Sequence, residues 1–99
     1  MDTSKSRRFN TADVVRLAVR LKQVSDLTRL HVMLLLGEEE HSVGALSKAT
    51  GHGMSALSRH LSLLRLAEVV DCRRDGQRNI YVLTASGREL HRVVIAVLS

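Results

Sequence analysis

The hydrophobic repeat of this chain changes character once, and that change restricts the fold more than any other feature. Up to about residue 67, apolar side chains recur every three or four residues, as on one face of an α-helix. In the runs 69–74 and 79–83 the spacing becomes that of strands. Thr84 then restarts a helical pattern that continues to the end. This order predicts four helices, a β-hairpin and a last helix, with a short strand near His41.

The predicted helices have recognisable ends. Thr11 is expected to cap the first helix, and Ser25-Asp26 the second, because such side chains accept hydrogen bonds from free backbone N–H groups. The second helix is apolar on nearly every side and should lie in the middle of the domain. Gly37 and the acidic run 38–40 are expected to end it. Since that run would repel DNA, we expect it to lie off any DNA-binding face.

Length and composition limit the class of protein. The chain has 99 residues, which suits a basic arm at 1–10, expected to be flexible, and one domain at 11–99. The net charge of +5 favours a polyanionic partner. One cysteine excludes an intrachain disulfide, and no apolar run approaches the ~20 residues of a membrane span. We therefore expect a soluble, cytoplasmic protein.

Two predicted helices, at 43–50 and 54–67, are joined by the short turn Gly51-His52-Gly53, as in a helix-turn-helix. The second helix should point one apolar stripe inward, made of Met54, Leu57, Leu61 and Leu64. The outward side presents Ser55, Ser58, Arg59 and Ser62, with Arg65 further along. Hydroxyl groups and guanidinium groups can bond base edges and phosphates. This face is therefore predicted to enter a groove of double-stranded DNA.

The predicted hairpin supplies a second basic surface. Asp75-Gly76 is expected to form its turn, because both residues tolerate positive φ angles. The polar side chains that flank this turn are Arg73, Arg74, Gln77 and Arg78. Guanidinium groups on a protruding ribbon suit contacts to the DNA backbone or the minor groove. Directly after a helix-turn-helix, such a hairpin is typical of a wing.

Several motifs resemble the ArsR/SmtB family of regulators. They are Ser25-Asp26-Leu27-Thr28-Arg29-Leu30, Ser58-Arg59-His60-Leu61, Ala67-Glu68-Val69-Val70 and Ile80-Tyr81-Val82-Leu83, together with the arginine-rich turn. The resemblance covers roughly residues 12–98. It implies a mainly α fold with a small β-hairpin wing: a winged helix-turn-helix of five helices. Leu27 departs from the family's usual proline, and Glu68 from its frequent glycine.

The resemblance also implies a homodimer that reads a palindromic operator and represses transcription until an effector binds. Its interface would be formed by the first and last helices. The candidate interface residues are Val14, Leu17, Leu21, Leu90, Val94 and Val97. The surplus of apolar side chains on the last helix independently favours a partner surface.

Neither metal site of the family is complete in this sequence. Ser42 and Gly44 occupy the positions of its Cys-x-Cys pair, and neither can supply a thiolate. Glu89 and His91 resemble half of its zinc site, but no second half follows. We predict no metal and no cofactor, and packing or surface roles for the histidines. Cys72 is interpreted as a buried, inert thiol, with a reactive thiol as the alternative.

The sequence allows two alternatives to a DNA-binding repressor to be compared: a protein-interaction module and an enzyme. The same basic face could meet an acidic protein, which would make the chain a winged-helix interaction module. An enzyme is not expected, because the sequence contains no catalytic triad spacing, phosphate loop or HExxH motif. The sequence names no operator and no inducer.

Overall fold

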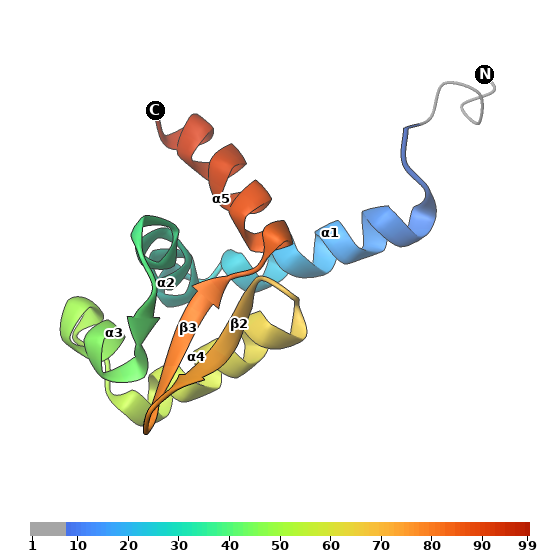
Figure 1. Ribbon diagram of the computed structural model, residues 1–99. Helices are drawn as coiled ribbons and strands as arrows, with labels where there is room; N and C mark the ends of the chain where they lie inside the picture. Colours follow the sequence, from blue (N-terminus) through green and yellow to red (C-terminus); the bar gives the residue numbers. More distant parts are fainter. Residues whose placement is uncertain (1–7) are drawn as a thin grey trace, which may run out of the picture.

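The computed structural model describes residues 8–99 and has the predicted order of elements (Figure 1). Its helices and strands are α1 (Thr11–Val24), α2 (Leu27–Glu38), β1 (His41–Ser42), α3 (Val43–Thr50), α4 (Met54–Leu66), β2 (Val70–Asp75), β3 (Arg78–Leu83) and α5 (Ala85–Leu98). The prediction of five helices with a small hairpin is confirmed, as is the short strand at His41. Most of the predicted basic arm lies outside the described residues. Among residues 8–99, none of the helices could span a lipid bilayer.

Side-chain caps explain where most helices begin. Asp26 accepts a hydrogen bond from the Arg29 backbone N–H at 3.0 Å, and Thr84 accepts one from Gly87 at 2.9 Å. The predicted cap of α1 was wrong by one residue. Asn10, not Thr11, accepts from the Asp13 N–H, because Asn10 still has an extended backbone. Helix α4 has only Gly53 at its cap and no side-chain hydrogen bond there.

The three strands form one antiparallel sheet in the order β1-β3-β2. Asp75 pairs with Arg78, so the two residues of the hairpin turn are Gly76 and Gln77. The predicted turn at Asp75-Gly76 was therefore displaced by one residue. Gly76 alone has the positive φ, 62°, that a tight hairpin needs at its first turn position. Asp75 instead extends β2.

Helix α2 lies at the centre of the core, as predicted. Val32, Met33 and Leu36 are buried. They belong to one apolar cluster with side chains from all four other helices, to which α1 contributes only Val24. Gly37 does not end α2, which continues to Glu38. A Cβ atom on Gly37 would lie 2.0 Å from Nε2 of His91. The His91 ring of α5 thus lies against the Gly37 backbone, and a side chain at position 37 would displace that ring.

The end of α4 is a Schellman motif. The Val69 N–H donates to the Leu64 carbonyl and the Glu68 N–H to the Arg65 carbonyl, both at 2.9 Å. Glu68 has a φ of 61°, the left-handed conformation that normally favours glycine. Val69 and Leu64 are both fully buried, which supplies the apolar contact of the motif. The position where the sequence departs from the family's glycine is therefore a strained one.

Replacing Glu68 with glycine should stabilise the protein. A non-glycine residue in the left-handed region costs about 1–2 kcal/mol, part of which glycine's greater freedom in the unfolded chain offsets. We expect Glu68→Gly to raise the free energy of unfolding by about 1 kcal/mol, measured by urea denaturation.

Glu68→Ala is the matched control, because it removes the carboxylate but keeps the strain. If alanine stabilises as much as glycine, the gain comes from removing the charge, and the strain argument fails.

Candidate nucleic-acid interface

The outer face of α4 is the first part of the candidate interface. Leu57, Leu61 and Leu64 are fully buried and orient the helix. The five side chains predicted to face DNA are all exposed: Ser55, Ser58, Arg59, Ser62 and Arg65. Arg59 makes no ion pair with any residue in 8–99. Its guanidinium group is available to an external partner.

Met54 does not lie where the sequence predicted. It was expected to begin the inward stripe, but it is 52% exposed. Met54 is the first residue of α4, and the core begins one turn later, at Leu57. The thioether therefore adds an apolar group to the exposed end of the helix, beside Ser55.

The predicted wing has an exposed tip, where Arg74 Nε donates to the Gly76 carbonyl at 3.0 Å, and a base with an ion-paired arginine. Arg74, Gln77 and Arg78 are exposed around the turn. Arg73, in contrast, forms an ion pair with Glu40, from the acidic run between α2 and β1. One member of that run therefore neutralises a wing arginine. Arg65 is also near a carboxylate, with 4.0 Å between its guanidinium group and Asp71.

An arginine on α2 holds the middle of α4. Arg29 donates from Nε to the Gln23 carbonyl at 2.6 Å, and its Nη1 lies 3.0 Å from Nδ1 of His60 on α4. The Asp26 carboxylate lies 3.9 Å from the same His60 nitrogen. The backbone hydrogen bond from Arg29, together with the positive charge of that residue, holds the pKa of Asp26 below 3.8 despite partial desolvation. Asp26, Arg29 and His60 thus form one polar contact between α2 and α4.

A second arginine, from α1, holds the end of α4. Arg20 donates from Nε to the Ala67 carbonyl at 3.1 Å, and its side chain is only 17% exposed. A cation is stabilised there because the helix dipole is negative at its C-terminus. The sequence analysis missed this role. The sequence feature that could have indicated this role is the spacing of Arg20, three residues after Leu17 and four before Val24, which places it on the apolar side of α1.

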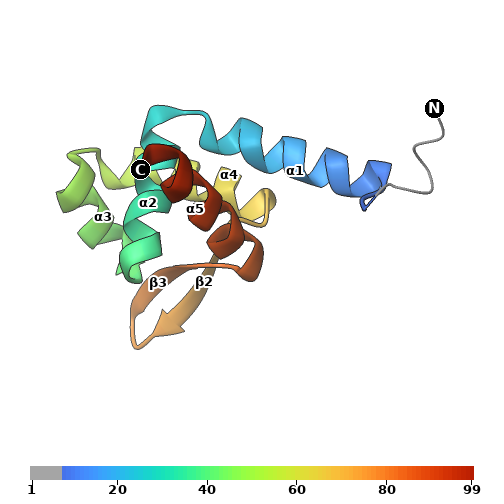
Figure 2. The same ribbon diagram turned by 90° about the horizontal axis from the view of Figure 1, so that it is seen from above.

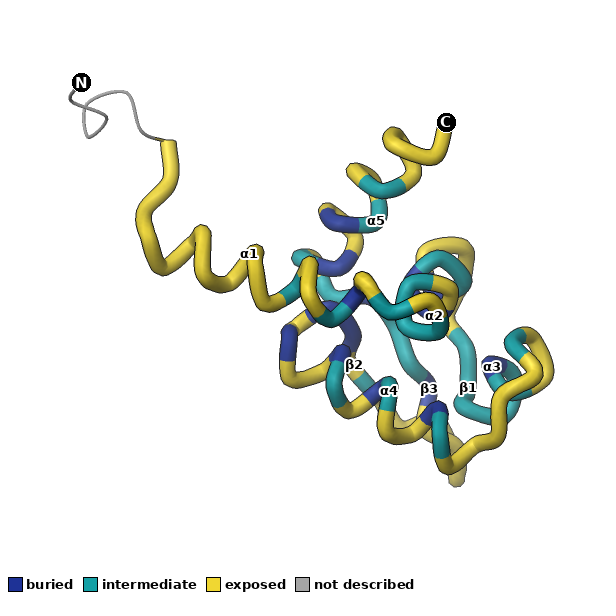
Figure 3. The backbone as a smooth tube through the Cα atoms, turned by 180° about the vertical axis from the view of Figure 1, so that it is seen from behind, coloured by how far each residue is buried: buried dark blue, intermediate teal, exposed yellow. Residues whose placement is uncertain are grey.

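Helices α1 and α5 expose the apolar side chains predicted to form a dimer interface. The N-terminal part of helix α1 extends away from the domain, and the helix buries only Val24 (Figures 2 and 3). Among the candidates, Val14, Leu17, Leu21 and Val97 are exposed, and Val94 is half-buried against the core. Leu90 is already a core residue of the single chain.

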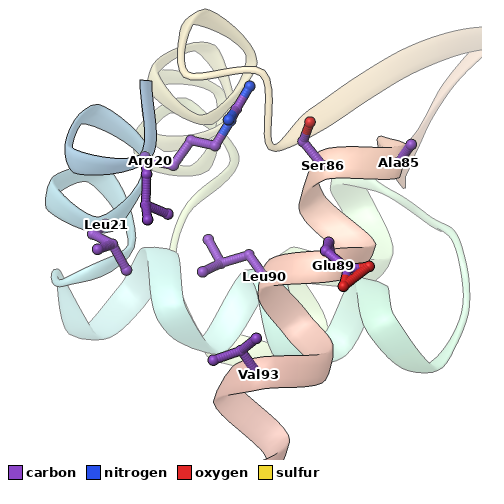
Figure 4. Close-up of a pocket in the computed structure, with 8 residues that line it drawn as sticks. Arg20, Leu21, Ala85, Ser86, Glu89, Leu90 and Val93 are labelled. Carbon is purple, nitrogen blue, oxygen red and sulfur yellow. The ribbon is translucent and has the colours of Figure 1, made fainter. Parts of the chain in front are cut away.

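The two helices enclose a groove of about 540 Å³ (Figure 4). Leu17 and Leu21 line it from α1, and Leu90 and Val93 from α5. Val93 is 49% exposed and was not among the predicted interface residues. The groove thus joins the exposed apolar faces of the first and last helices.

The structure places the candidate metal and redox residues apart. Ser42 caps α3, and Glu89 forms an ion pair with Arg92. Within 8–99, no three His, Cys, Asp or Glu side chains are arranged to hold a metal ion. Cys72 is half-buried, whereas a buried thiol was predicted, and it pairs across the strands with Tyr81. Burial and then the adjacent thiol raise the pKa of Tyr81.

Known proteins share this arrangement. A family model described as "Bacterial regulatory protein, arsR family" matches residues 26–71, from the cap of α2 to β2. YgaV, an HTH-type transcriptional regulator of Escherichia coli K12, is 34% identical over 88 residues, which cover 88% of this chain and 86% of YgaV. The chain belongs to the ArsR family. The resemblance seen in the sequence motifs is therefore confirmed.

Solved structures agree with the ArsR assignment. HlyU from Vibrio cholerae has a TM-score of 0.82 at 28% identity, over 89% of this chain and 97% of HlyU. The homodimeric winged helix-turn-helix DNA-binding domain of Mb0332 from Mycobacterium bovis has a TM-score of 0.81 at 26% identity, over 99% of this chain and 86% of that domain. The predicted fold is confirmed. These relatives are regulators and not enzymes, as expected.

This chain matches only part of the length of three other curated relatives. It spans 55%, 50% and 63% of their lengths.

The contact around Asp26 predicts how stability depends on pH. The pKa of Asp26 is lower in the folded chain than the ordinary aspartate value of 3.8. Its stabilising contribution is therefore complete above that value and is lost as the pH falls through the folded pKa. We expect Asp26→Asn to be less stable than wild type at about pH 6, with a difference that shrinks towards about pH 3. Urea denaturation at both pH values measures it.

Asparagine caps a helix nearly as well as aspartate, so this variant isolates the charge. Asp75→Asn, at the exposed end of β2, is the matched control. A difference between wild type and Asp26→Asn that does not change with pH would contradict the role assigned to the carboxylate.

Proposed function

We propose that this ArsR-family chain is a homodimeric DNA-binding repressor. Its recognition helix would be α4, placed in the major groove of a palindromic operator, and its hairpin would be the wing. The observation that carries the proposal is the exposed serine and arginine face of α4, opposite three fully buried leucines. Small hydroxyl side chains allow the helix to approach base edges, and Arg59 can bond guanine through two parallel hydrogen bonds.

The wing adds contacts that do not depend on base sequence. Arg74 and Arg78 lie at the exposed tip, whereas Arg73 is already paired with Glu40. Guanidinium groups at such a tip suit phosphate oxygens, which position a protein without reading sequence. The net charge of +5 supports the same partner. Binding should weaken with salt, with a log–log slope of about −0.9 for each neutralised phosphate.

Arg59 and Arg74 should differ in their effect on specificity. Arg59→Ala should weaken binding to a selected operator by about 1–3 kcal/mol and reduce discrimination against random duplex, because it removes a base contact. Arg74→Ala should weaken binding to both duplexes by a similar factor, because it removes a phosphate contact. Fluorescence anisotropy at fixed salt measures both, after selection of bound genomic fragments supplies the operator.

Arg92→Ala, on α5 and outside the α4 face and the wing, is the control for lost charge, and its oligomeric state is measured beside its DNA binding because α5 belongs to the proposed interface. If no duplex binds wild type with submicromolar affinity at moderate salt, the proposal fails. An acidic protein partner for the same face would then be the better explanation.

The dimer proposal is based on the apolar surface that one chain leaves uncovered. The exposed side chains of α1 and α5 form two faces that border one groove. The homodimeric Mb0332 domain, with the same fold, supports a second copy as the partner. A two-fold dimer would present two α4 helices to one side of the duplex, about 34–36 Å apart, which matches a palindromic site.

An acidic residue at the end of α5 should separate the subunits. Val97 is 81% exposed, so Val97→Asp leaves the core of one chain intact but buries a charge in the proposed interface. We expect a monomer by sedimentation equilibrium and at least a tenfold loss of operator affinity.

Leu27→Asp is the matched control, because Leu27 is 82% exposed at the start of α2. A Val97→Asp protein that stays dimeric, or a monomer with wild-type operator affinity, would contradict the proposal.

A further inference from the structure

A second cleft, of about 550 Å³, lies between α2, the sheet and α5. These three elements pack against one another, and the cleft is separate from the α1–α5 groove. Its volume lies in the range of small-molecule sites. We name it the Arg88 cleft, after the α5 arginine that lines it. Its polar lining residues are Glu40, Arg73, Arg88 and His91.

The charges of the Arg88 cleft favour an anion. Glu40 is its one carboxylate, and the ion pair with Arg73 neutralises it. Arg88 then supplies an uncompensated positive charge. Its Nη1 donates to the Leu83 carbonyl at 2.8 Å, which holds the guanidinium group in place. The other N–H groups of this guanidinium bond no acceptor within 8–99, so they can bind a carboxylate.

His91 forms one wall of the cleft. Its ring lies against the backbone of Gly37, where any Cβ atom would overlap it. The absence of a side chain at Gly37 leaves the space that the ring occupies. No hydrogen bond to the described residues occupies the ring nitrogens. A neutral imidazole can donate from one nitrogen to an anion beside Arg88.

The remaining lining of the cleft is apolar and comes from Leu36, Val82 and Leu83. Leu36 and Leu83 are only 5% and 4% exposed, so half-buried Val82 offers most of the apolar surface in the cleft. An organic anion would cover that surface with its hydrocarbon part, which is favourable, whereas a bare inorganic anion would not. The uncompensated charge of Arg88 also opposes a metal cation here. The lining therefore selects a ligand with one charged end and one apolar end.

We propose that the Arg88 cleft binds a small organic carboxylate, with its charged group at Arg88 and His91 and its apolar part on Leu36 and Val82. Such a ligand would also lie beside Arg73 and compete with Glu40 for it. Because Arg73 belongs to β2, binding would change how the wing is held. That consequence rests on the proposed DNA-binding function, whereas carboxylate binding itself does not.

Benzoate and its uncharged analogue benzamide test the cleft with the full chain. Isothermal titration should show saturable benzoate binding, with benzamide at least about tenfold weaker, since a charge-assisted hydrogen bond is lost. Arg88→Gln should weaken benzoate at least about tenfold. Arg92→Gln, on the same helix but outside the lining, should change it less than twofold. In NMR spectra, benzoate should shift the His91 ring signals and benzamide should not.

Absence of saturable benzoate binding by wild type would overturn the proposal. So would benzamide binding within tenfold of benzoate, which requires no variant, or a folded Arg88→Gln protein with more than a tenth of the wild-type affinity. An unshifted His91 would also overturn it. DNA affinity measured without benzoate tests the repressor proposal separately, so the two failures can be told apart.

Discussion

The burial of one side of α4 is the constraint on which the rest of the structure depends. Leu57, Leu61 and Leu64 are fully buried in the apolar core, at whose centre α2 lies. Each such side chain contributes about 1.5–3 kcal/mol when it leaves water. Because an α-helix turns about 100° per residue, the direction of these leucines determines the direction of Ser55, Ser58 and Arg59. The candidate DNA-binding face is thus a consequence of the core.

Arginines have two different uses in this chain. Arg20 and Arg29 bond to backbone or histidine groups inside the domain and hold the end and middle of α4. Arg73 is paired with Glu40. Arg59 and the tip arginines remain for an external anion. The net charge is therefore larger than the charge available to DNA. Arg20 and Arg29 instead hold α4 in position, and α4 carries Arg59, which is unpaired within residues 8–99.

Most of the apolar surface left uncovered is on α1 and α5. Helix α1 buries one residue, although much of its sequence is apolar. A lone chain of 99 residues buries a modest share of its surface, and a partner subunit would cover the apolar side chains left exposed.

Strain at Glu68 and the missing side-chain cap at Gly53 show that α4 is not optimised for stability at either end.

The sequence by itself determined the elements and their order, because hydrophobic period, caps and turn residues are local signals. It also identified the outward residues of α4 and the arginine-rich hairpin. Only the tertiary structure decided that Met54 is exposed, that the His91 ring lies against the backbone of Gly37, and that the Arg29 guanidinium group contacts the His60 ring. Each depends on how close two segments distant in the sequence come to each other. Helical period gives the direction of a side chain, but the packing of the neighbouring elements decides what that side chain meets.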